Sequence, residues 1–116
     1  MLEKMNLELI REIDITDTKK VIILVSSFDK IYQLIFNNIV NFSYSIDFDK
    51  EINTSELDII DIQYQYDYPT NETLRTYSYR ANKELSTHKL HYLFIYGDIE
   101  LTILSKALSV NEIGKV

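Results

Sequence analysis

Apolar and polar residues alternate along several stretches of this chain, which is the pattern of half-buried β-strands. The first such stretch covers residues 5–15, and its alternation is interrupted at Ile10 and Arg11. The interruption indicates a β-bulge there, with a short amphipathic helix as the alternative for this stretch. Residues 21–25 form an apolar, largely β-branched run without a polar face. That run predicts a strand covered on both sides.

A helical pattern follows the second stretch. Ser26 or Ser27 can cap a helix, because a serine hydroxyl accepts from an amide of the first turn. Apolar residues then recur at helical spacing: Phe28, Ile31, Tyr32, Leu34, Ile35 and Ile39. We therefore predict one helix over residues 27–39. A single helix over residues 17–40 is the competing interpretation, which the β-branched run disfavours without excluding.

Two strands with clear alternation come next, over residues 42–49 and 57–68. In the second, Ile62, Tyr64 and Tyr66 share one face. Residues 69–72 have turn chemistry, which predicts a hairpin back along residues 75–80. Its register places Tyr66 opposite Arg75, Tyr64 opposite Tyr77 and Ile62 opposite Tyr79, with Arg80 beside Asp61.

A further strand begins at Leu90 and has apolar residues on both faces, which is typical of a central strand. Gly97 and Asp98 predict a hairpin turn into a last strand over residues 99–103. The tail, residues 105–116, is predicted as a short helix or a frayed end. Together these elements predict a single α+β domain over residues 1–116, with a curved, mainly antiparallel sheet of about five to seven strands and the helix at residues 27–39 packed on one face.

Composition narrows the class of protein. The 116 residues are 46% hydrophobic and include nine Tyr and five Phe, so a folded globule is expected rather than a disordered acidic tail. With two Gly, the chain lacks the glycines of a phosphate-binding loop or a dinucleotide fingerprint. The absence of Cys suits a reducing compartment. Since no signal peptide or membrane span is evident, we expect a cytoplasmic protein.

The negative charge is regional. Residues 41–72 carry eight acids and one base, whereas the rest of the chain is close to neutral. If the strands at 42–49 and 57–68 are neighbours, their outer face presents Asp47, Asp49, Asp61 and Asp67. Such a face attracts a basic protein and repels nucleic acid. A merely solubilising surface accounts for the same charges.

Tyrosines accompany the acids on the second of these strands. Tyr66 and Tyr68 lie near its end, where their hydroxyls can reach water, and we predict them as partner contacts. Packing of the tyrosine face beneath the helix is the alternative. His88 and His91, three apart, point to opposite faces of a strand and are interpreted as ordinary strand histidines.

Sites for chemistry are not indicated. Asp47, Asp49 and Glu51 have the spacing to share one side of a strand, but without a calcium-binding loop they are interpreted as a solvated face rather than a metal site. No catalytic residue, cofactor or metal is predicted, and the chain is not expected to be an enzyme.

In size, acidity, absence of Cys and Asn-, Ile-, Lys- and Tyr-rich composition, the chain resembles the immunity proteins of contact-dependent inhibition and other polymorphic toxin systems of bacteria. The resemblance covers overall character and no motif. It implies one-to-one binding to a cognate nuclease toxin domain, with the acids of residues 47–67 facing the toxin's basic site. The chain as a monomer or a homodimer is equally compatible with the sequence.

Three other functions stay open. A phage-encoded inhibitor could mimic nucleic acid by presenting carboxylates in place of phosphates. A small ligand-binding domain would show a cavity lined by Tyr and a perturbed His91 or Asp. An assembly subunit would pair apolar strand edges across a symmetric interface.

Overall fold

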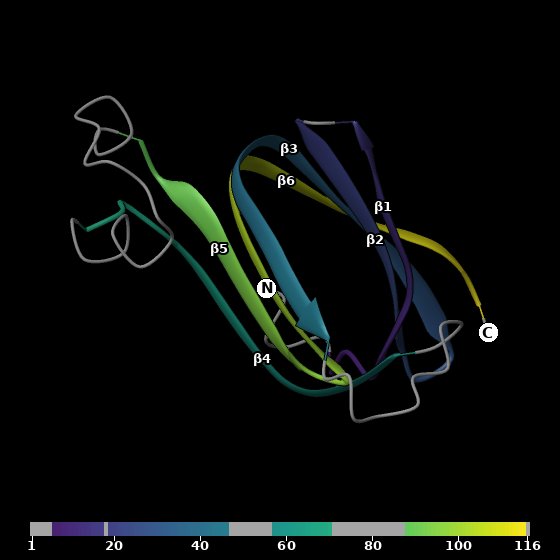
Figure 1. Cartoon of the computed structure of the whole chain (residues 1–116). Coiled ribbons are helices and arrows are strands. Elements are labelled where there is room, and N and C mark those ends of the chain that lie inside the picture. Colours follow the sequence, from purple (N-terminus) through teal and green to yellow (C-terminus); the bar gives the residue numbers. More distant parts are fainter. Residues whose placement is uncertain (1–5, 18, 47–56, 71–87, 116) are drawn as a thin grey trace.

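A computed structural model describes residues 6–17, 19–46, 57–70 and 88–115, and all regular secondary structure within these ranges is β. Six antiparallel strands form one sheet that closes into a barrel in the order β1-β2-β3-β6-β5-β4 (Figure 1). The strands are β1 (Leu9–Asp17), β2 (Lys20–Ser27), β3 (Lys30–Ile46), β4 (Leu57–Asp67), β5 (Leu90–Gly97) and β6 (Ile99–Lys115). The barrel therefore consists of two three-stranded meanders, joined by β3 with β6 and by β1 with β4.

The predicted α+β fold is wrong, because the predicted helix at residues 27–39 is a β-hairpin and the start of the long strand β3. Ser27 pairs with Lys30 across a turn formed by Phe28 and Asp29. Within β3, Leu34 and Phe36 are fully buried while Ile35 between them is half-buried. The competing helix over residues 17–40 is wrong for the same reason.

The error has a physical cause. A strand that is partly covered on both faces carries consecutive apolar residues, such as Leu34, Ile35 and Phe36. Such a run satisfies a spacing of three or four residues as well as a spacing of two, so periodicity alone cannot separate the two structures. The many β-branched and aromatic residues of β3 favour the strand that forms.

Several predicted strands are confirmed. β1 has a register shift between Ile10 and Glu12, so the predicted bulge lies at Arg11. β2 and β4 coincide closely with the predicted strands, and β5 is central, between β4 and β6. The predicted tail is wrong, because β6 continues to Lys115 and pairs along its length with β3.

The predicted neighbours of the two acidic strands are also wrong. β3 lies between β2 and β6, whereas β4 lies between β5 and β1. In the described residues, Tyr66, Tyr64 and Ile62 of β4 pair with His91, Leu93 and Ile95 of β5. The predicted partners at residues 75–80 lie outside the described ranges.

The core lies mainly against β2, β3, β5 and β6. The fully buried side chains of these four strands that contribute to it are Ile23, Val25, Leu34, Phe36, Leu93, Ile95, Leu101 and Ile103. β4 contributes only partly buried side chains among its described residues, namely Leu57, Ile59, Ile62 and Tyr64. The barrel is consequently best packed opposite the junction of β1 and β4.

The predicted turn at Gly97 and Asp98 joins β5 to β6, as expected, but glycine is needed there for a different reason. Gly97 does not have a positive φ. Instead, β4 passes so closely that a Cβ at Gly97 would overlap the carbonyl oxygen of Asp58. Asp98 fixes this approach, since the Asp58 amide donates to its Oδ2 at 2.8 Å and its own amide donates to the Asp58 carbonyl at 3.0 Å.

The described part of the chain contains no helix of the length and apolarity needed to cross a membrane.

Candidate protein-binding surface

An aromatic cluster lies at the end of β4, formed by Tyr64, Tyr66 and His91. His91 pairs directly with Tyr66 across the β4–β5 ladder, which brings the two rings together at 4.2 Å between centroids and 18° between planes. The Tyr64 hydroxyl hydrogen-bonds to Nδ1 of His91 at 2.6 Å. The imidazole thus contacts two tyrosines that lie two residues apart on β4 and holds both in fixed positions.

The cluster continues outward from the core to solvent. Tyr64 packs against the core, whereas Tyr66 is 50% exposed and Tyr68 is 55% exposed. Nζ of Lys89 lies 5.6 Å from the ring centroid of Tyr66 and 5.8 Å from that of Tyr68. Both predicted contact tyrosines therefore present accessible ring surface, and both already lie within cation–π distance of an ammonium group.

Partial burial lowers the pKa of His91, because the charged imidazolium would lose part of its hydration. The neutral form is therefore the stable one near neutral pH. This ring stacks and hydrogen-bonds within the aromatic cluster, and it does not line the pocket described below.

The predicted contact acids of β4 are exposed. Oδ1 of Asp61 accepts from the amide of Ile62 at 2.9 Å, and Oδ1 of Asp67 accepts from the amide of Tyr68 at 2.7 Å. A carboxylate has about four acceptor sites, so each keeps capacity for a partner. Asp67 lies between the two exposed tyrosines in the sequence, and its carboxylate is hydrogen-bonded to the backbone of Tyr68.

The other two predicted acids, Asp47 and Asp49, lie outside the described residues. The face that they were expected to share with Asp61 and Asp67 required neighbouring strands, and β3 and β4 are not neighbours.

A different grouping of charge results from closure of the barrel. Among the described side chains, the adjacent strands β1 and β4 together carry one base, Arg11, and five acids: Glu12, Asp14, Asp58, Asp61 and Asp67. The other four strands carry four bases, Lys20, Lys30, Lys106 and Lys115, and two acids, Glu100 and Glu112. One side of the barrel is therefore acidic. The share of β1 is not visible along the sequence, because β1 and β4 are distant in the chain and become neighbours only in the fold.

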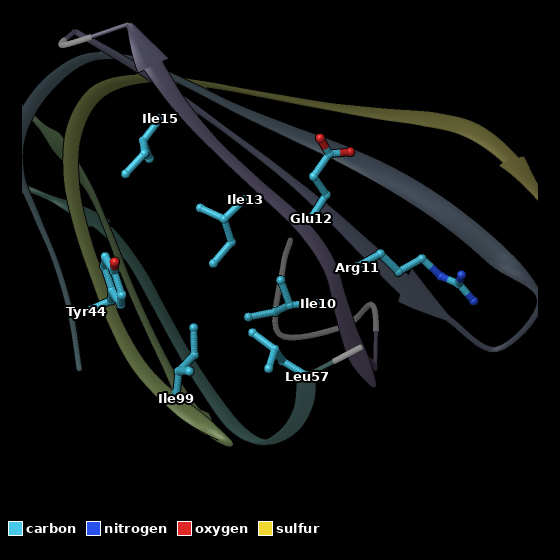
Figure 2. A pocket seen from close by; sticks show the side chains of 8 residues that line it. All are labelled: Ile10, Arg11, Glu12, Ile13, Ile15, Tyr44, Leu57 and Ile99. Atoms are coloured by element: carbon cyan, nitrogen blue, oxygen red, sulfur yellow. The ribbon is translucent and has the colours of Figure 1, made fainter. Parts of the chain in front are cut away.

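A pocket of about 370 Å³ opens beside β1 (Figure 2). In Figure 2, six side chains surround one space, while Arg11 and Glu12 point away from it on the other side of β1. The six are Ile10, Ile13, Ile15, Tyr44, Leu57 and Ile99. They come from four strands, so no local sequence signal could have shown this pocket.

Among the described residues, no group of three or more His, Asp or Glu side chains is arranged to hold a metal ion. Fold and surface together define a six-stranded antiparallel β-barrel with one acidic side, an exposed tyrosine cluster and an apolar pocket. Comparison with protein-family models, curated proteins and solved structures finds no match for this chain.

Proposed function

We propose that the chain is a binding protein that neutralises a basic protein partner, as an immunity protein inhibits its cognate nuclease toxin. The observation that supports this most directly is the concentration of five acids with described side chains on the adjacent strands β1 and β4. An acidic side of a small protein accelerates encounter with a basic surface and disfavours nucleic acid.

A protein that neutralises its partner also has to dissociate from it slowly. The tyrosines next to these acids can provide this slow dissociation. Tyr66 and Tyr68 are half-exposed, amphipathic and partly fixed by His91 and Lys89, so they lose little side-chain entropy on binding. Their ring faces lie near an ammonium group already. Arg or Lys side chains of a basic partner can use the same cation–π attraction.

The first experiment tests the role of charge. Tagged protein is used to recover a basic partner from host lysate, and binding of the two purified proteins is then measured over a series of salt concentrations. The double variant Asp61→Asn and Asp67→Asn should slow association severalfold at low salt and flatten its salt dependence. The matched control Glu100→Gln with Glu112→Gln, on β6, should leave both unchanged.

A second measurement on the same pair tests the anchors. Tyr66→Ala with Tyr68→Ala should raise the dissociation rate constant by about tenfold or more, as expected for loss of central aromatic contacts. Phe28→Ala removes an even more exposed ring, on the β2–β3 turn, and should have no effect. Recovery of self-associated protein in place of a basic partner would contradict the proposal.

A further inference from the structure

The pocket beside β1 is continuous with the hydrophobic core. Ile10 and Ile99, which form its deep part, are buried and belong to the core. Ile15 and Tyr44, at its mouth, are 47% and 52% exposed. All residues that line the pocket lie within the described ranges. The pocket is therefore a part of the barrel interior that these side chains leave unfilled.

The bulge at Arg11 gives the pocket its shape. Ile10 and Ile13 are three residues apart, so in a regular strand their side chains would point to opposite faces. The extra residue of the bulge shifts this alternation by one, and Ile10, Ile13 and Ile15 all point into the same space (Figure 2). β1 thereby provides three of the six side chains that surround the pocket. Bulges that redirect side chains in this way are frequent at barrel rims and next to functional sites.

The lining selects an uncharged ligand. The six surrounding side chains are aliphatic except for Tyr44, whose hydroxyl is the one polar group among them. Arg11 and Glu12 also border the pocket, but their side chains point away from it on the other side of β1 (Figure 2). A charged ligand would lose hydration without an opposite charge from these lining side chains. An uncharged apolar ligand gains free energy when it leaves water for the same surroundings.

The volume limits the size of the ligand. An apolar cavity of roughly 150 Å³ accepts one benzene molecule, and the pocket measures about 370 Å³. An apolar body of about eight to twelve carbon atoms matches this volume. Since the mouth is open to solvent at Ile15 and Tyr44, a polar end of the ligand keeps its hydrogen bonds to water there.

We propose that this pocket binds a small uncharged amphiphile, a molecule with an apolar body of that size and one hydroxyl group, such as a medium-chain alcohol. The apolar body lies among the isoleucines, and the hydroxyl group stays at the mouth beside Tyr44. Such a ligand contacts four strands, β1, β3, β4 and β6, and stabilises the folded barrel because it binds only the folded state. The site goes beyond the proposed function and does not depend on a protein partner.

The test uses 1-octanol as the probe, titrated into isotope-labelled protein and followed by NMR. We expect saturable shifts of the amide signals of the lining residues. 1-Hexanol should bind roughly 15-fold more weakly, because each buried methylene contributes about fourfold in affinity. Octanoate, which has the same chain length and a negative charge, should bind at least about tenfold more weakly than 1-octanol. Equal binding of 1-octanol and octanoate, or no saturable shift at the solubility limit of 1-octanol, would overturn the inference.

Two isoleucines give a matched pair of variants. Ile15 at the mouth and Ile113 on β6 are 47% and 50% exposed, so the fold is expected to tolerate a larger side chain at either position. Ile15→Trp places an indole ring at the pocket and should weaken binding of 1-octanol at least about tenfold, since less apolar surface is left for the ligand. Ile113→Trp lies outside the lining and should leave binding unchanged.

Thermal unfolding provides a second measurement on the same proteins. 1-Octanol should raise the Tm of the wild type and of Ile113→Trp, because a ligand of the folded state shifts the unfolding equilibrium. It should raise the Tm of Ile15→Trp much less. Circular dichroism without ligand shows whether both variants fold, and the comparison of 1-octanol with octanoate needs no variant. Equal effects of 1-octanol on the two variants would overturn the inference.

Discussion

Gly97 shows at the scale of one residue how closely two strands approach in this barrel. A Cβ there would overlap the carbonyl oxygen of Asp58 and lie 3.0 Å from the Cα of Ile59, both of which are backbone atoms and cannot rotate away. Gly114, near the end of β6, has open space around the position of a Cβ. The two glycines of the chain therefore differ entirely in their structural role.

We predict that Gly97→Ala destabilises the protein by about 2–3 kcal/mol, because β4 or the β5–β6 turn must move to accommodate the methyl group. Gly114→Ala should change the free energy of unfolding by less than about 1 kcal/mol. Urea denaturation of both variants measures this difference. Equal stabilities would show that β4 does not approach the turn as closely as described.

His91 makes stability depend on pH. Burial lowers the pKa of His91 in the folded protein, so the unfolded chain binds the proton more readily. The contribution of neutral His91 is complete above its unfolded value of about 6.5 and is lost as the pH falls from there through the folded-state pKa. Protonation would also place a charge beneath Tyr66.

We predict that His91→Asn reduces the loss of stability between neutral pH and pH values below 6.5. Urea denaturation of both proteins at several pH values provides the measurement, and the carboxylates common to both proteins cancel in the comparison. Parallel curves for His91→Asn and the wild type would exclude this role for His91.

At the scale of the element, the residues predicted as a helix, 27–39, form the β2–β3 turn and the first part of β3. A helix over residues 27–39 places Phe28 on its apolar stripe and leaves Phe36 off it. In the barrel the burial of the two rings is the opposite of this, since Phe36 is fully buried and Phe28 is 70% exposed. Phe28 also has a φ of 56°, a left-handed conformation that a hairpin turn imposes on its first central residue.

We predict that Phe36→Ala lowers the free energy of unfolding by about 3–5 kcal/mol. Phe28→Ala should change it by no more than about 0.5 kcal/mol, because the ring is exposed and alanine keeps the same backbone geometry. Thermal or urea denaturation of the two variants gives the ranking. A larger loss of stability in Phe28→Ala than in Phe36→Ala would instead support a helix over residues 27–39.

At the scale of the whole molecule, the two meanders depend on the long pairing of β3 with β6. The distal half of β6, residues 106–115, pairs with the start of β3 and packs Leu108 and Val110 against the core. Without this half of β6, the two meanders would be joined only by the remaining half of the β3–β6 pairing and by the two residue pairs of β1 with β4. The segment that the sequence predicted as a short helix or a frayed end is thus part of the closure.

We predict that truncation after Ser105 costs about 3 kcal/mol or more, since two aliphatic side chains contribute about 1.5 kcal/mol each at the low end and ladder hydrogen bonds are lost with them. Truncation after Asn111 removes the exposed residues 112–115, together with residue 116, and should cost less than about 1 kcal/mol. Circular dichroism during thermal unfolding compares the two. Equal stability would show that the distal half of β6 is frayed.

The sequence by itself determined most of the strands. Alternation located β1 with its bulge at Arg11, β4, and β5 as a central strand, because side-chain period and backbone geometry are local properties. It also predicted Asp61, Asp67, Tyr66 and Tyr68 as exposed positions. Their role in binding a partner stays a prediction.

Only the tertiary structure decided which strands are neighbours and whether β3 is a helix or a strand. Consecutive apolar residues satisfy both periods, and the choice depends on β2 and β6, which pair with β3 on both edges. The same closure places β1 beside β4, gathers their acids on one side and forms the pocket from four strands. These features come from pairing between residues far apart in the chain, so they cannot be predicted from local sequence patterns.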